Sequence, residues 1–136
     1  MEDKYAVDRH KIMFHPERLS LWLRARNNWE KAKKVYPIYV EISSSGLCNH
    51  RCRFCALDYL GYKSGLANFK NLKRAINDMA KGGVKSIQFG GEGEPLLHPK
   101  IKEIVRYAKS QGLDISFTTN GALLKEGLLR DILPLV

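Results

Sequence analysis

Three cysteines are the residues of this sequence whose type and spacing most clearly allow chemistry. Cys48, Cys52 and Cys55 form a C-x3-C-x2-C pattern and are the only three cysteines among the 136 residues. An odd number of closely spaced thiols argues against a disulfide framework and favours metal binding. Three thiolates can bind three irons of a cubane cluster, which leaves the fourth iron open to a small molecule.

Zinc is the main competing interpretation of the same residues. A structural zinc ion needs four protein ligands, so His50 or the more distant His98 would have to join the thiolates. The pattern alone therefore leaves two classes open. One is an enzyme whose cluster binds a small molecule; the other is a non-catalytic zinc or iron–sulfur binding module, whose basic charge would suit contact with RNA.

The net charge of +9 allows an anionic partner but does not require one. The basic residues are spread along the chain without a dense arginine tract, as on an ordinary solvated surface. The sequence has no apolar run of the ~18 residues that a membrane span needs, and its N-terminus has no apolar signal region. We expect a cytoplasmic protein that does not bind membranes.

The elements that must position the cysteines follow an alternating βα pattern. Short β-branched runs predict strands at 38–42, 84–89 and 113–118. Amphipathic segments predict helices from a cap at Asn68 to Gly82, from Pro99 to Gly112, and over 123–133. The second and third strands begin about 30 residues apart, as in one right-handed βαβ unit. The fold class is therefore α/β with a parallel sheet, either open or part of a barrel.

Alternation within the strands predicts that the two faces of the sheet differ. Ile87 and Phe89 would point to the covering helices, whereas Gln88 and the equivalent polar residues of the other strands would point away. A polar second face favours a wet or ligand-filled lumen. A register error of one residue is the alternative, because it would exchange the two faces.

Residues 1–36 are a polar lead-in with one predicted helix. Pro16 suits its first turn, and Leu19, Trp22 and Leu23 form an apolar stripe. The pair at 27–28 is expected to end or weaken this helix.

Two further motifs complete the pattern around the cysteines. The second strand is followed by Gly90-Gly91-Glu92-Gly93-Glu94-Pro95, and the third ends in Thr118-Thr119-Asn120-Gly121. Together with an aromatic residue, Phe54, directly before the last cysteine, these motifs resemble those of radical S-adenosylmethionine (radical SAM) enzymes. The resemblance covers about residues 37–121.

This resemblance implies a chemistry and a set of site residues. Cys48, Cys52 and Cys55 would bind a [4Fe–4S] cluster that reductively cleaves S-adenosylmethionine to a 5′-deoxyadenosyl radical, which abstracts hydrogen from an unidentified substrate. No further catalytic residue is assigned. The electron would come from a donor such as flavodoxin or ferredoxin, and the substrate could be a peptide, a nucleotide or a small metabolite. The expected cofactor-binding residues are Phe54, Gly91, Glu92, Gly93, Glu94 and Pro95, with Thr118 and Asn120 near substrate or cofactor.

Two glutamates compete for one role in the glycine-rich loop. The alignment through Pro95 favours Glu94 over Glu92 as the acceptor for the ammonium group of S-adenosylmethionine. We therefore expect Glu94 to contribute more to binding this cofactor.

The resemblance also sets the expected domain organisation. The family's core usually has six βα units, and this sequence supplies three. We expect 37–136 to be the N-terminal half of a partial (β/α)6 TIM-like barrel, truncated at its C-terminus and preceded by a helical extension at 1–36.

Overall fold

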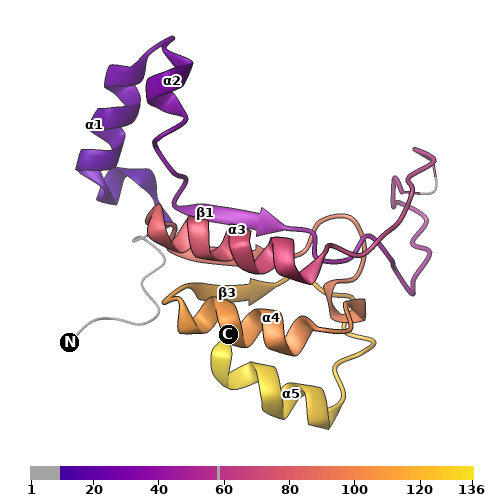
Figure 1. Cartoon of the computed structure of the whole chain (residues 1–136). Coiled ribbons are helices and arrows are strands. Elements are labelled where there is room, and N and C mark those ends of the chain that lie inside the picture. Colours follow the sequence, from indigo (N-terminus) through magenta and orange to yellow (C-terminus); the bar gives the residue numbers. More distant parts are fainter. Residues whose placement is uncertain (1–9, 58) are drawn as a thin grey trace.

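The computed structural model describes residues 10–57 and 59–136. Three strands form one parallel sheet in the order β1-β2-β3: β1 (Tyr39–Ile42), β2 (Ser86–Phe89) and β3 (Asp114–Phe117). The helices that alternate with them are α3 (Phe69–Lys81), α4 (Ile101–Ser110) and α5 (Glu126–Ile132). All three pack on one face of the sheet (Figure 1), which confirms the predicted α/β class with parallel strands.

The predicted strand faces are correct. Ile87 and Phe89 are fully buried between the sheet and the helices, where Phe89 also packs against Phe117 of β3. On the opposite face, the hydroxyl of Tyr39 lies 2.6 Å from the amide oxygen of Gln88, whose nitrogen donates to the hydroxyl of Thr118. Polar side chains therefore cross all three strands on the face without helices.

One tyrosine on this polar face has a shifted pKa. Desolvation, and then the hydrogen bond to the carboxylate of Glu41, raise the pKa of Tyr39 to about 12. Tyr39 therefore stays protonated throughout the physiological range and can keep donating a hydrogen bond.

Local signals explain where the covering helices begin and end. The side chain of Asn68 accepts a hydrogen bond from the N–H of Asn71, so α3 begins at the predicted cap, and Gly83 turns the chain with a φ of +85° directly after it. Helix α4 begins at Ile101, two residues after Pro99. Helix α5 begins at Glu126 rather than at 123, because the preceding residues form a turn in which the N–H of Leu124 bonds the carbonyl of Gly121.

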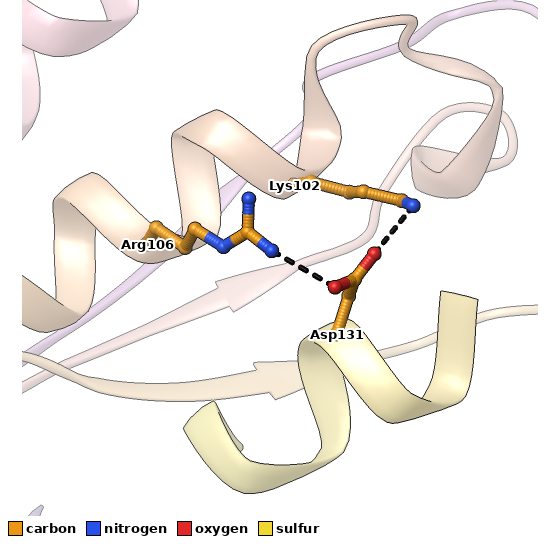
Figure 2. Close-up of polar contacts among 3 residues, drawn as sticks. All are labelled: Lys102, Arg106 and Asp131. Atoms are coloured by element: carbon orange, nitrogen blue, oxygen red, sulfur yellow. Dashed lines mark hydrogen bonds and ion pairs between the residues drawn. The ribbon is translucent and has the colours of Figure 1, made fainter. Parts of the chain in front are cut away.

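An ionic contact fixes α5 against α4. The carboxylate of Asp131 lies 2.5 Å from the Nζ of Lys102 and 2.9 Å from a guanidinium nitrogen of Arg106 (Figure 2). The hydrogen bond from Lys102, supported by both positive charges, lowers the pKa of Asp131. The short η4 (Leu133–Leu135) follows α5.

The N-terminal extension stands beside the end of the sheet at which the strands begin (Figure 1). It contains η2 (Ile12–Phe14), α1 (Pro16–Ala25) and α2 (Trp29–Ala32), while residues 1–9 lie outside the described part of the chain. Helix α2, which is capped by the side chain of Asn28, was not predicted from the sequence. The predicted stripe on α1 is only partly covered, because Trp22 and Leu23 are 54% and 57% exposed.

Arg18 of α1 connects the extension to the sheet layer by bonding the carbonyls of Pro37 and Gly83. Across the residues that the structure describes, no helix is both long enough and apolar enough to cross a membrane. The η3 turn (Pro95–Leu97) lies in the loop after β2, within the site described next.

Candidate cofactor-binding site

The three sequence motifs meet at one edge of the sheet. Each occupies the loop that leaves the carboxyl end of a strand, and the longest of these loops, after β1, extends beyond the strand ends (Figure 1). Parallel strands end at the same edge, so motifs about 40 and 70 residues apart in sequence become neighbours.

The cysteines lie in the loop after β1 with different degrees of exposure. Cys52 is exposed, whereas Cys48 and Cys55 are half-buried. The N–H of Cys55 bonds the carbonyl of Cys52 at 2.9 Å, which forms a tight turn between them. The sulfur of Cys48 lies 3.4 Å from the N–H of His50 and 3.9 Å from the side-chain nitrogen of Asn120. Within residues 10–57 and 59–136, no three side chains of Cys, His, Asp or Glu are close enough together to hold a metal ion.

Glu94 occupies the centre of this edge. Its side chain is only 1% exposed, and one carboxylate oxygen accepts hydrogen bonds from the hydroxyl of Thr119 at 2.7 Å and the N–H of Leu96 at 3.0 Å. The other oxygen accepts from the N–H of Asn120 at 2.8 Å. The backbone N–H of Glu94 donates to the carbonyl of Leu47 at 2.7 Å. This one residue therefore contacts the loops after all three strands.

Gly93 is required by the close approach of two loops. It has a φ of +117°, and a Cβ atom built on it would lie 2.5 Å from the carbonyl oxygen of Ser45 and 2.7 Å from that of Leu47. Only glycine combines this conformation with this lack of space. Gly91 also has a positive φ, +92°, beside Ser43.

The remaining predicted site residues differ in their burial and in whether they contact the cysteine loop. Pro95 is buried at the start of η3, and Asn120 reaches the cysteine loop, where its side chain donates to the side-chain oxygen of Asn49 at 2.9 Å. Phe54 is 90% exposed and Glu92 is exposed. Thr118 lies on the polar sheet face and bonds Gln88 rather than the cysteine loop.

Sequence reasoning missed two residues of this network, Thr119 and Asn49. Strand alternation directs attention to residues 118 and 120 on one face and away from Thr119 between them. Asn49 had a usable signal, because it directly follows the first cysteine and carries a polar side chain.

The family of the chain follows from a comparison with known proteins. Residues 42–135 match the family model described as the Radical SAM superfamily. The chain belongs to the radical SAM superfamily. Its members use a [4Fe–4S] cluster and S-adenosylmethionine, as the resemblance implied.

Similar radical SAM proteins are much longer than this chain. It is 33% identical over 96 residues to the tungsten-containing aldehyde ferredoxin oxidoreductase cofactor-modifying protein of Pyrococcus furiosus, covering 70% of this chain and 26% of that protein. It is 40% identical over 92 residues to the GTP 3′,8-cyclase of Chlorobaculum tepidum, covering 66% of this chain and 28% of the cyclase. The chain thus spans less than a third of the length of either relative.

Two solved structures share the fold of this chain. Streptococcus suis SuiB, bound to its precursor peptide SuiA, superposes with a TM-score of 0.65 at 19% identity, covering 97% of this chain and 28% of SuiB. BtrN, in complex with AdoMet and 2-DOIA, gives a TM-score of 0.59 at 23% identity, covering 72% of this chain and 42% of BtrN. At these identities the likeness concerns the fold alone.

The donor chemistry of the cysteine loop fits the superfamily's cluster better than a structural zinc ion. The loop offers three thiols, and the sulfur of Cys48 already has two N–H donors of the kind that tune cluster thiolates. His98, a candidate fourth zinc ligand, is buried with both ring nitrogens engaged: Nε2 lies 3.0 Å from the carbonyl of Ala67, and Nδ1 accepts from the N–H of Lys100.

Proposed function

We propose that this chain is the cluster-binding part of a radical SAM enzyme, with Cys48, Cys52 and Cys55 as the ligands of a [4Fe–4S] cluster. When bound, the cluster supplies the electron that cleaves the carbon–sulfur bond of S-adenosylmethionine. The observation that carries the proposal is the meeting of the cysteine loop with the loops of Glu94 and Asn120 at one sheet edge, within a superfamily that uses these cofactors.

The chain's own residues would bind and orient the cofactors. The three thiolates would hold three irons and leave one open for the amino and carboxylate groups of S-adenosylmethionine. The loop from Gly91 to Pro95 lies beside the cysteine loop, where its backbone groups and the exposed carboxylate of Glu92 would be available to the methionine end of the cofactor. Phe54, Thr118 and Asn120 remain candidate contacts.

The arrangement of the sheet supports a partial barrel. Helices cover one face only, and the other face carries the polar row from Tyr39 to Thr118. We propose that residues 37–136 form the first three units of a (β/α)6 barrel, in which the polar face of the sheet lines a lumen. Residues 1–36 would be a helical extension of this barrel. We expect a cytoplasmic location. An ordinary closed barrel would fill this face with bulky branched side chains instead.

The substrate and the electron donor stay open within this proposal. The names of similar proteins include a GTP cyclase, nucleotide dehydratases and a cofactor-modifying protein, and SuiB is seen with a precursor peptide. This range covers nucleotides, peptides and small metabolites without selecting one. A small redox protein such as flavodoxin or ferredoxin is the expected electron donor.

Anaerobic reconstitution with iron and sulfide tests the ligand assignment. We expect about four irons per chain and a broad charge-transfer band at about 400 nm, as for thiolate-bound cubane clusters. Replacing any one of Cys48, Cys52 or Cys55 with Ala should abolish or destabilise the cluster, whereas the matched control Glu92→Gln should retain it. Full clusters in all three cysteine variants would refute the assignment, and tight zinc uptake with rejection of iron would favour the non-catalytic module.

A further inference from the structure

The contacts of Glu94 indicate a role for this residue that the sequence did not predict. Its backbone N–H bonds the carbonyl of Leu47, directly before Cys48, and its carboxylate bonds Thr119 and Asn120 in the loop after β3. We propose that Glu94 is a positioning residue that fastens the cysteine loop to the other two loops, and that it does not itself bind the ammonium group of S-adenosylmethionine. This proposal deepens the proposed function and rests on it for its purpose, although the alkylation rates that test it first are measured without cluster or cofactor.

The burial of the carboxylate supports an internal role. The side chain is 1% exposed and already has three donors from the protein: the N–H groups of Leu96 and Asn120 and the hydroxyl of Thr119. A buried carboxylate needs such donors, and hydrogen bonds to a charged acceptor are among the stronger ones in proteins. A cofactor ammonium would have to reach this buried group, whereas Glu92, two residues earlier, is exposed.

The restraint reaches Cys48 along two routes. One runs through the backbone, from the N–H of Glu94 to the carbonyl of Leu47. The other runs through Asn120, whose N–H is held by Glu94 and whose side chain contacts Asn49 and the sulfur of Cys48. Among the residues that the structure describes, Cys52 and Cys55 make no hydrogen bond to this network, so Glu94 should restrain Cys48 selectively.

Glu94→Gln separates this role from a general contribution to folding. The glutamine oxygen can still accept from Leu96 and Thr119, but its NH2 group then faces the N–H of Asn120, and two donors meet in a buried place. The loop after β3 should therefore detach from the cysteine loop while the sheet stays folded.

Site-resolved alkylation of the three thiols measures the effect. The metal-free, reduced protein is treated anaerobically with iodoacetamide, and the rate at each cysteine is followed by mass spectrometry. We expect Glu94→Gln to raise the rate at Cys48 relative to Cys55 several-fold, up to about tenfold, the factor that corresponds to loss of one net hydrogen bond. The matched control Glu92→Gln should leave the ratio unchanged.

A second pair of variants keeps the test decisive if Glu94→Gln folds poorly. Thr119→Val removes one donor to the carboxylate of Glu94 and should raise the ratio of the Cys48 rate to the Cys55 rate, but less than Glu94→Gln does. Thr119→Ser keeps the hydroxyl, so its ratio should equal that of the unsubstituted protein. An unchanged ratio in Glu94→Gln and Thr119→Val, or an equal acceleration at all three cysteines, overturns the proposal. An unchanged ratio with weaker S-adenosylmethionine binding by cluster-loaded Glu94→Gln would assign the carboxylate directly to the cofactor. If the protein shows the selective effect at Cys48 but takes up no cluster, the proposed function is wrong and the positioning role of Glu94 stands.

Discussion

Gly93→Ala is the substitution whose cost can be worked out most fully from the structure. The added methyl group would sit 2.5 Å from the carbonyl oxygen of Ser45, 2.7 Å from that of Leu47 and 2.8 Å from the carbonyl carbon of Gly46. These neighbours are backbone atoms, so no side chain can rotate away. The same residue must also hold a φ of +117°, which L-residues with a side chain rarely adopt.

Two terms make up the expected loss of stability. Backbone strain at such a conformation costs roughly 1–3 kcal/mol, and forcing an extra methyl group into packed surroundings costs a further ~1–3 kcal/mol. We expect a total decrease of about 2–6 kcal/mol in the free energy of unfolding. A domain of ordinary stability has about 5–15 kcal/mol, so a loss at the upper end of this range would unfold the protein only if its own stability lies near the lower end.

Two other glycines separate the terms. Gly112 has a φ of +80° but open space around its Cβ position, so Gly112→Ala reports strain alone, about 1–2 kcal/mol. Gly65 has neither a positive φ nor a close neighbour, so Gly65→Ala should change stability little. Urea denaturation of the reduced protein, followed by circular dichroism, measures all three. A loss in Gly93→Ala no larger than that in Gly112→Ala would show that the cysteine loop does not rest against Gly93.

Two further predictions concern α5. Asp131→Asn should lower the melting temperature at pH 7 and low salt, because the native pairing with Lys102 lowers the pKa of the Asp131 carboxyl. The stabilisation that this ion pair contributes is present above the ordinary Asp pKa of about 3.9. It is lost as the pH falls through the lower pKa of the folded protein. The difference from the unsubstituted protein should therefore shrink in acid and in about 1 M salt, and a difference independent of both would contradict the ion-pair explanation. Gly127→Ala, within α5 and with no atom near the added Cβ, should raise the free energy of unfolding by about 0.5–1 kcal/mol in urea denaturation, and a decrease would show that the helix is not formed there in solution.

The sequence predicted most of the α/β layer because local signals agreed with one another there. The cap at Asn68, the apolar face of α3 and the glycines after it all specify the same helix, and strand alternation gave the correct faces for Ile87 and Phe89. It missed α2 because a four-residue helix has too few positions for an apolar period to appear, although its cap at Asn28 was readable. It extended α5 too far because Leu123 and Leu124 belong to a turn before the helix, in which Leu123 packs against the core.

The site was predictable in its location and less so in its internal contacts. Parallel strands bring their carboxyl ends to one edge, so the order of the motifs along the chain was enough to gather the three loops. The contacts between loops depend on which backbone N–H groups are left without a partner in the folded chain, and sequence does not display these. The N–H of Asn120 is such a group: it lies beyond the end of β3 and finds the carboxylate of Glu94 across 26 residues of sequence.

A motif glutamate can therefore be essential for two different physical reasons that sequence cannot distinguish. A carboxylate that binds a cofactor must keep lone pairs accessible, whereas one that joins loops must be buried and fully supplied with donors. Glu92 meets the first condition and Glu94 the second, because Gly93 lets the chain turn inward between them. Two glutamates separated by one glycine thus place one carboxylate outside and one inside the same loop, and in the function we propose this would divide contact with the cofactor from fixation of the cysteine loop.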